Sequence, residues 1–280
     1  MPRRLRLDAE LVRRGLARSR EHASELVAAG RVSVRGMVAH KSATAVATDA
    51  PVVVAEDVDD PGWASRGAHK LVGALEAFEP DGLAVAGRRC LDAGASNGGF
   101  TDVLLRREAA AVVAVDVGYG QLDWKLRTDD RVVVRDRTNV RSLTAENIGG
   151  PVDLVVADLS FISLKLVLPA LIGCAGPGAD VVPMVKPQFE VGKQRLGSGG
   201  VVRDPALREE AVLDVVRFGA EHGFGLRGVV ASPLPGPSGN VEYFAWLRSG
   251  PGAVDAAELV AEAVRSGPQT PVKGAKGGAR

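Results

Sequence analysis

Cys90-Leu91-Asp92-Ala93-Gly94-Ala95-Ser96-Asn97-Gly98-Gly99-Phe100 is the stretch that decides the fold, because an apolar strand runs there into a glycine-rich turn and a helical pattern follows. Glycine lets the backbone approach a ligand closely and adopt positive φ, and a helix start offers unpaired N–H groups. The stretch therefore indicates a nucleotide-type pocket, with an ordinary turn of an α/β protein as the alternative.

The glycine spacing distinguishes between nucleotides. It reads Asp92-x-Gly94-x-x-x-Gly98-Gly99, which matches neither a P-loop nor a dinucleotide-binding turn. The next expected strand ends at Asp116, whose carboxylate can accept hydrogen bonds from both hydroxyls of an adenosine ribose. Because no lysine follows the turn to hold phosphates, we predict S-adenosylmethionine as the cofactor. The residues expected to bind it are Gly94, Ala95, Ser96, Asn97, Gly98, Gly99, Phe100, Asp116 and, near the adenine, Asp136.

Positive charge is concentrated at the amino-terminal end of the chain. Residues 1–41 carry ten Arg and Lys against four Asp and Glu, whereas the whole chain of 280 residues has a net charge of +1. Such a basic module indicates a polyanionic partner, and a solvated helix face is the alternative.

Residues 1–60 have the pattern of a small α+β module. Asp8 is expected to cap a helix that runs through Leu16, and Ser19 a second helix that ends at Gly30, before a hairpin at 32–38 and a strand at 52–54. The spacing Asp8-x-x-Leu11-Val12-x-x-Gly15-Leu16-x-x-Ser19-Arg20-x-x-Ala23 resembles an S4 RNA-binding domain. The resemblance implies recognition of structured RNA through its shape and phosphates. The expected RNA contacts are Arg4, Arg6, Arg18, Arg20, Arg31 and Lys41, with Arg66, Arg137 and Lys193 on the second domain.

A linker at 61–65 leads into a second domain at 66–250, in which strands and helices alternate. Strands are expected at 88–92, 112–116, 132–134, 153–158, 181–186, 227–231 and 243–247. This alternation predicts a doubly wound, Rossmann-like α/β sheet. The connection before the last strand is short, so we expect that strand to enter antiparallel. Residues 251–280 are expected to form a helix fragment and a basic disordered tail.

The sequence also indicates the cellular compartment of the protein. Cys90 and Cys174 lie in apolar segments, which indicates free thiols and a cytoplasmic protein. The basic start predicts no secretory signal, and the longest apolar run contains Pro169 and Pro177, so no bilayer-spanning stretch is expected.

Four polar side chains fall at the edge of the expected sheet where ligands bind, the carboxyl ends of the strands. Asp158 and Lys186 end two strands, Glu242 precedes the last one, and Lys70 begins the helix that leads into the sheet. Singly, Asp158 could cap the next turn and Lys186 could be a surface lysine, and Glu242 and Lys70 could form one structural ion pair. Two lysines and two carboxylates at one edge favour catalysis instead. The motif of base N-methylation is missing after Asp158, and neither cysteine is placed for C5 methylation.

This set of four resembles the ribose 2′-O-methyltransferases of the FtsJ type. With the segments 63–70, 94–100, 157–163, 185–190 and 232–240, residues 3–248 resemble the TlyA family, an S4 domain joined to an FtsJ-like methyltransferase and historically named hemolysin. The resemblance implies 2′-O-methylation of cytidines in ribosomal RNA within ribosomal subunits, with Lys70, Asp158, Lys186 and Glu242 catalytic. Asn97 departs from the Ser or Thr usual in the family's glycine loop.

A ribose hydroxyl is a poor nucleophile, so the site must stabilise a developing alkoxide in line with the methyl group. We expect Lys186 to accept or orient the hydroxyl proton, Asp158 and Glu242 to hold the lysines, and no metal to be needed. We expect a monomer that binds neither DNA nor membranes. Two alternatives stay open: an RNA-binding assembly factor without catalysis, and a membrane-active hemolysin, for which the sequence offers no spanning helix.

Overall fold

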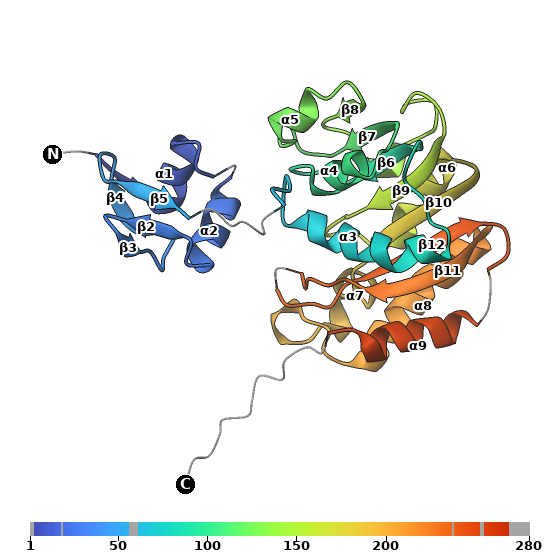
Figure 1. The fold of residues 1–280 in the computed structure, drawn as a ribbon. Helices are drawn as coiled ribbons and strands as arrows, with labels where there is room; N and C mark the ends of the chain where they lie inside the picture. The colour runs from blue at the N-terminus through green and yellow to red at the C-terminus, as the bar shows by residue number, and fades with distance from the viewer. Residues whose placement is uncertain (1–2, 18, 56–60, 237, 253–254, 269–280) are drawn as a thin grey trace, which may run out of the picture. The chain divides into compact units, whose positions relative to one another are not determined.

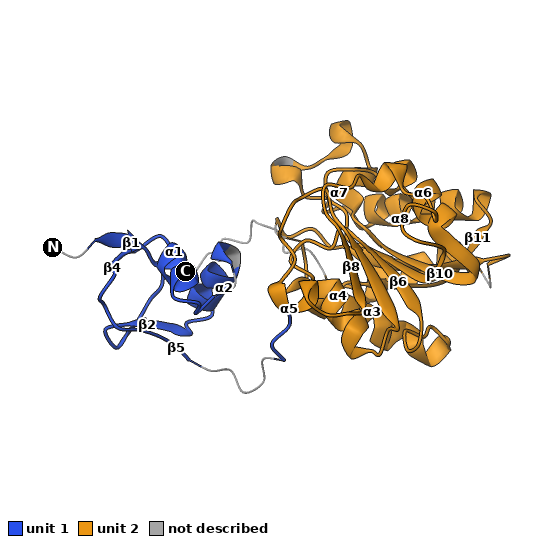
Figure 2. Cartoon of the chain, turned by 90° about the horizontal axis from the view of Figure 1, so that it is seen from above, with its two compact units in different colours: residues 1–65 blue, residues 66–280 orange. Residues whose placement is uncertain are grey.

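The structure is a computed structural model that describes residues 3–17, 19–55, 61–236, 238–252 and 255–268. It divides into two compact units, residues 1–65 and 66–280 (Figure 2). Within the described residues, no helix combines the length and the apolar character needed to cross a bilayer. Two predictions fall outside the described residues, namely the RNA contact at Arg18 and the basic tail from residue 269 onward.

In the first unit, two helices pack on two small sheets. Its elements are β1 (Arg4–Arg6), α1 (Leu7–Arg13), α2 (Arg20–Ala28), β2 (Val32–Val34), β3 (Met37–Val38), β4 (Ala45–Ala47) and β5 (Val52–Val54). β1 pairs with β4, and β2 pairs with both β3 and β5, all antiparallel. Leu7, Leu11 and Leu26 of the helices are buried against Val32 and Val46. The predicted hairpin, the strand at 52–54 and the Ser19 cap are confirmed; Ser19 Oγ accepts a hydrogen bond from the His22 N–H.

The predicted start of the first helix is wrong. α1 begins at Leu7, so Asp8 lies inside the helix rather than at its cap position. A capping side chain must stand outside the helix to reach the N–H groups of its first turn. The Asp8 carboxylate is instead buried and paired with Arg6 and Arg20. The pairing of β1 with β4 was not predicted, because strands of three residues carry too little periodicity to be recognised.

The second unit contains the expected alternation of strands and helices (Figure 1). Its strands are β6 (Arg89–Ala93), β7 (Ala111–Val115), β8 (Val132–Arg135), β9 (Val152–Ala157), β10 (Ala175–Val185), β11 (Phe224–Ala231) and β12 (Tyr243–Ser249). Its α-helices are α3 (Gly67–Phe78), α4 (Gly99–Arg106), α5 (Trp124–Arg127), α6 (Leu168–Cys174), α7 (Pro187–Glu190), α8 (Pro205–Glu221) and α9 (Ala256–Ser266). Short 3-10 helices are η1 (Glu79–Asp81), η2 (Val140–Ser142), η3 (Leu164–Leu166), η4 (Lys193–Arg195) and η5 (Ser198–Gly200).

These strands form one sheet in the order β11-β12-β10-β9-β6-β7-β8. Neighbours from β10 to β8 are parallel, and β12 is antiparallel to both β10 and β11. The predicted doubly wound sheet with an antiparallel last strand is therefore confirmed. The chain winds outward from β6 in one direction and from β9 in the other, so the order reverses between these two strands. Ligands of such sheets bind at the carboxyl ends of the strands at this reversal.

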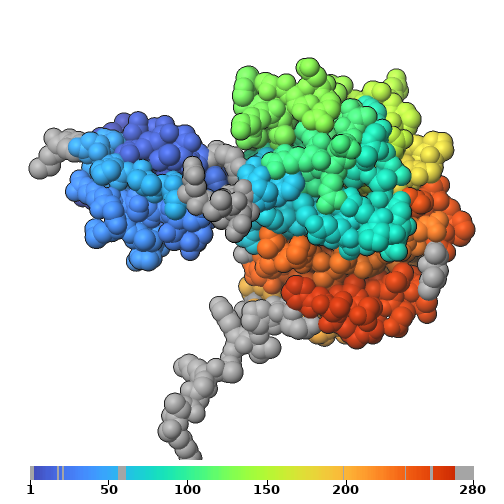
Figure 3. Space-filling model, in the orientation of Figure 1, coloured from blue at the N-terminus to red at the C-terminus, as the bar shows by residue number. Residues whose placement is uncertain are grey.

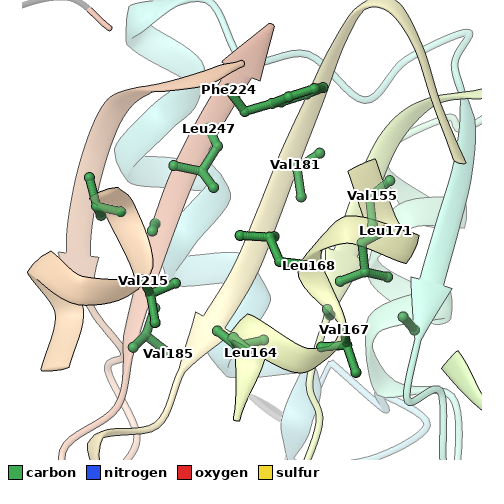
Figure 4. Packing of buried hydrophobic residues seen from close by; sticks show 14 of the residues in the cluster. Val155, Leu164, Val167, Leu168, Leu171, Val181, Val185, Val215, Phe224 and Leu247 are labelled. Atoms are coloured by element: carbon green, nitrogen blue, oxygen red, sulfur yellow. The ribbon is translucent and has the colours of Figure 1, made fainter. Parts of the chain in front are cut away.

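Helices cover both faces of the sheet. α6, α8 and α9 pack on one face, where Leu168, Leu171 and Val215 lie against Val155 and Leu247 (Figure 4). α3 and α4 cover the other face, and the surface of α3 (cyan) lies between the green and orange segments in Figure 3. β10 begins at Ala175, earlier than predicted, because it continues past a register shift between Ala175 and Asp180 that contains Pro177 and Gly178.

Candidate active site

The glycine turn between β6 and α4 lies at the reversal of the strand order. The N–H groups of Gly94 and Ala95 donate to the Val115 carbonyl at 2.8 and 3.1 Å. Gly94 has φ of 91°, and a Cβ there would lie 2.4 Å from the Asp158 carbonyl oxygen. A side chain is therefore excluded, and the turn presents bare backbone beside the end of β9.

The rest of the predicted cofactor set lies around this turn. Asp116 accepts hydrogen bonds from the Ser96 N–H at 2.9 Å and the Gly118 N–H at 2.7 Å. Asp136 accepts from the Gly120 N–H at 3.1 Å and pairs with Arg127 at 2.8 Å, and this arginine lowers the pKa of Asp136. The remaining members have these positions: Gly98 caps α4, Gly99 begins it, Asn97 is half-buried, and the buried Phe100 ring faces Phe244.

Asp92, the last acidic residue before this turn, was not assigned a role from sequence. It is fully buried at the end of β6; its Oδ2 accepts a hydrogen bond from Thr101 Oγ1 at 2.6 Å, and its Oδ1 has no hydrogen-bond partner among the residues that the structure describes. Burial raises the pKa of Asp92 to about 7, and the charges of Asp158 and Asp116 act in the same direction. Its place two residues before Gly94 was the available signal.

Stability should therefore depend on pH through Asp92. Its pKa is raised on folding, so between about pH 4 and pH 7 the folded protein holds a proton that the unfolded chain has already released, and stability falls as pH rises towards 7. Between pH 5 and pH 8 this contribution amounts to roughly 3 kcal/mol, at about 1.4 kcal/mol per pH unit. Asp92→Asn should remove it. Urea unfolding at the two pH values measures the effect, and an equal loss in wild type and variant would contradict it.

The four predicted catalytic residues form two ion pairs. Lys70 Nζ lies 2.6 Å from Glu242 Oε2, and Lys186 Nζ lies 2.6 Å from Asp158 Oδ1. Both lysines and Glu242 are buried, whereas Asp158 is half-buried. Each lysine thus has one carboxylate partner, so neither positive charge is buried alone.

β10 and the residues that follow it join the two pairs. Met184 Sδ lies 4.0 Å from Lys70 Nζ, and Gln188 Nε2 donates to Glu242 Oε1 at 3.4 Å. Between them, Lys186 Nζ donates to Ser160 Oγ at 2.9 Å. Met184 lies at the end of β10, Lys186 directly follows that strand and Gln188 lies in α7, so the structure brings all four predicted residues to one end of the sheet, next to the glycine turn.

The loop after β9 holds further residues that sequence reasoning did not assign. Phe161 is 90 % exposed and has φ of 65°, a region that aromatic residues rarely occupy. Its ring centroid lies 5.5 Å from that of Phe189 in α7. Glu190 at the end of α7 accepts hydrogen bonds from Ser163 Oγ at 2.6 Å and from the Leu164 N–H at 2.8 Å. The loop that carries Asp158 is thereby fastened to the segment that carries Lys186.

The predicted RNA contacts are mostly exposed arginines and lysines. Arg4 donates to the Ala45 carbonyl, Arg31 is half-buried and donates to the Ala55 carbonyl, and the Arg137 guanidinium lies 4.2 Å from the centre of the Tyr119 ring. Arg6 and Arg20 share Asp8. Lys41, Arg66 and Lys193 are exposed, Arg66 as the residue before α3 and Lys193 as the first of η4.

Comparison with known proteins agrees with this architecture. Residues 63–249 match the FtsJ-like methyltransferase family, and residues 5–47 match the S4 domain. The 16S/23S rRNA (cytidine-2'-O)-methyltransferase TlyA of Mycobacterium tuberculosis is 67% identical over 249 residues, which cover 89% of this chain and 91% of the relative. YqxC of Bacillus subtilis, provisionally named an rRNA methyltransferase, is 41% identical over 243 residues, 86% of this chain and 85% of the relative.

A solved structure from Streptococcus thermophilus, which carries a provisional hemolysin name, matches with a TM-score of 0.75 at 36% identity and covers 95% of both chains. The two matched domains, their order along the chain and the high coverage of these relatives all point to one family. The chain belongs to the TlyA family, in which an S4 domain precedes an FtsJ-like methyltransferase domain.

Proposed function

We propose that this protein transfers a methyl group from S-adenosylmethionine to the 2′-hydroxyl of a cytidine in ribosomal RNA. The observation that carries the proposal is the pair of ion pairs, Lys70 with Glu242 and Lys186 with Asp158, beside the glycine turn. The substrate follows from the name of the Mycobacterium tuberculosis relative and from the S4 domain.

The glycine turn fits the cofactor. Side chains at Gly94 and Gly98 would collide with the Asp158 carbonyl and with Leu126, so only glycine lets the turn pass this close to the end of β9 and to Leu126. Asp116 would accept hydrogen bonds from the ribose hydroxyls in exchange for the backbone N–H groups that it now holds. Asp136 would lie near the adenine. Bound S-adenosylmethionine supplies an electrophilic methyl group.

The lysines prepare the ribose oxygen. Lys186 Nζ, held by Asp158 and Ser160, has a third position through which it can contact the 2′-hydroxyl. From there it would accept or orient the hydroxyl proton and stabilise the negative charge that develops on the oxygen. Lys70 and Glu242 form the second ion pair, which contacts the same segment through Met184 and Gln188. The S4 unit and the basic residues of the second unit would hold the RNA backbone during this step.

The target nucleoside must leave its stack to reach this site. We expect its base to stack on Phe161, since this exposed ring follows Ser160 directly and packs on Phe189. Base stacking on an aromatic ring is worth about 1–3 kcal/mol. Phe161→Ala should therefore lower kcat/KM for RNA by roughly 10- to 100-fold and leave cofactor affinity unchanged.

Steady-state kinetics with ribosomal RNA measure this effect. Phe161→Tyr keeps the ring and should retain activity. Leu166→Ala removes another exposed apolar side chain, from η3, and serves as the control. Equal kinetics for Phe161→Ala and wild type would show that the base does not stack there.

The proposed activity is tested by methyl transfer from labelled S-adenosylmethionine to purified small and large ribosomal subunits. Alkaline hydrolysis cleaves RNA at every nucleotide except those with a methylated 2′-oxygen, so it maps the product. We expect an alkali-resistant cytidine. Label on a base, or no label on either subunit, would refute the proposal.

A further inference from the structure

One buried carboxylate in the first unit is shared by two arginines. Asp8 accepts from Arg6 through Nε at 3.1 Å and Nη2 at 2.8 Å, and from Arg20 Nη2 at 3.1 Å. Asp8 is buried, whereas the side chains of Arg6 and Arg20 are 52% and 59% exposed. The Asp8 cluster, defined as Arg6, Asp8 and Arg20, therefore has one buried carboxylate and two exposed guanidinium groups.

Each guanidinium keeps donors for a ligand. An arginine has five N–H groups, and Asp8 occupies Nε and Nη2 of Arg6 and only Nη2 of Arg20. Within the described part of the chain, Nη1 of Arg6 and both Nε and Nη1 of Arg20 have no hydrogen-bond partner. These N–H groups can donate to the oxygens of a phosphodiester, which a guanidinium binds through bidentate hydrogen bonds.

The carboxylate also removes an entropic cost of binding. A free arginine side chain loses about 0.5–1.5 kcal/mol of rotamer freedom when a ligand immobilises it. Asp8 already immobilises two of them, in positions set by the helix interior. The Arg6 guanidinium holds the pKa of Asp8 well below its usual range, so the carboxylate is charged at neutral pH.

We propose that Asp8 is a positioning residue for RNA, which presets Arg6 and Arg20 as one binding site for a backbone phosphate. The inference rests on the proposed RNA substrate. It adds the binding site, the phosphate as the group that is bound, and an acidic residue that favours binding of a polyanion. Such a role for Asp8 is the opposite of what net charge alone predicts. Asp8→Asn makes the unit more positive by one charge, which by long-range electrostatics should tighten RNA binding, whereas loss of the preset arginines should weaken it.

The chain contains a matched control two residues away. Glu10 is also buried in α1 and also pairs with two arginines, Arg13 and Arg14, each at 2.6 Å. Arg14 is separately fixed by the carbonyls of Thr48 and Ala50, at 2.9 and 2.8 Å, so it ties the unit together. Glu10→Gln therefore changes the net charge and breaks buried ion pairs as Asp8→Asn does, and leaves the Asp8 cluster intact.

The experiment measures the Kd of the full-length protein for ribosomal RNA by filter binding at two salt concentrations. We expect Asp8→Asn to bind about tenfold more weakly, with a shallower salt dependence, and Glu10→Gln to stay within about threefold of wild type. Asp8→Asn should raise KM for RNA with kcat unchanged. Affinity of Asp8→Asn equal to or above that of wild type would overturn the proposal.

A double-mutant cycle separates positioning from misfolding. In an Arg6→Ala, Arg20→Ala background, Asp8→Asn should cost no further affinity, because the groups that it positions are gone. A loss of the same size in that background would show that Asp8 acts on the fold, and would also overturn the proposal. The proposed function fails by a different result, namely wild-type protein that neither binds nor methylates ribosomal RNA.

Discussion

Lys186→Ala is expected to abolish methyl transfer while the protein still folds and still binds S-adenosylmethionine. Lys186 Nζ is the group that Asp158 and Ser160 hold at the end of β10, and no other cation touches these two side chains within the described residues. Removal of a single preorganised donor to a developing oxyanion costs about 10²–10³-fold in rate. The loss should be at least this large, since Lys186 also orients the nucleophile.

The measurement is methyl transfer to ribosomal subunits beside isothermal titration with S-adenosylmethionine. Lys165→Ala is the control, because Lys165 lies in η3, just after the loop that carries Asp158, and its ion pair with Asp214 is exposed and 3.7 Å long. We expect wild-type rates from Lys165→Ala and unchanged cofactor affinity from Lys186→Ala. Activity near wild type without the Lys186 amine would remove this residue from the mechanism.

Glu242→Gln is expected to damage both stability and catalysis. It would leave the buried Lys70 ammonium without its carboxylate, and breaking a buried pair by removing one partner costs about 3–5 kcal/mol. Lys70→Met combined with Glu242→Gln removes both charges, so much of the stability should return while activity stays lost. This difference separates the energetic role of the pair from its role in the site.

Urea unfolding followed by tryptophan fluorescence measures the stability, because Trp246 is buried in β12 with its ring centroid 5.6 Å from that of Phe78. Glu210→Gln is the control, since the exposed pair of Glu210 with Arg195 should contribute less than about 1 kcal/mol. Equal instability of the single and double variants, or a double variant that regains activity, would contradict the interpretation of the pair.

The strands of the second unit could be predicted because each is a short apolar run bounded by glycine, proline or charge. The place of Asp158 and Lys186 at one edge was predicted by the same reasoning, since parallel strands bring their carboxyl ends to one edge. The pair of Lys70 with Glu242 was one alternative from the sequence, but the full pairing within the site could not be derived, because it depends on strand order. That Glu242 faces Lys70 follows from β12 inserting next to β10, which no local pattern encodes.

Residues that act through distant partners were missed or misread. Asp8 has the residue type and the sequence position that are typical of a helix cap, and only the folded unit places Arg20 beside it. Glu190 lies in a helix of four residues, and its partners Ser163 and Leu164 belong to another connection of the sheet. The left-handed backbone of Phe161 also has no local signature, because it is imposed by the loop around it.

The Lys70 to Glu242 bond joins residues 172 positions apart in the chain. During synthesis at about 5–20 residues per second, Glu242 emerges roughly 10–30 s after Lys70. Until then β10 has no neighbour on its outer side, and α3 lacks the acid that neutralises its lysine. A nascent chain therefore cannot assemble the site before β12 has left the exit tunnel, and any product truncated ahead of residue 242 would be inactive however well its glycine turn had formed.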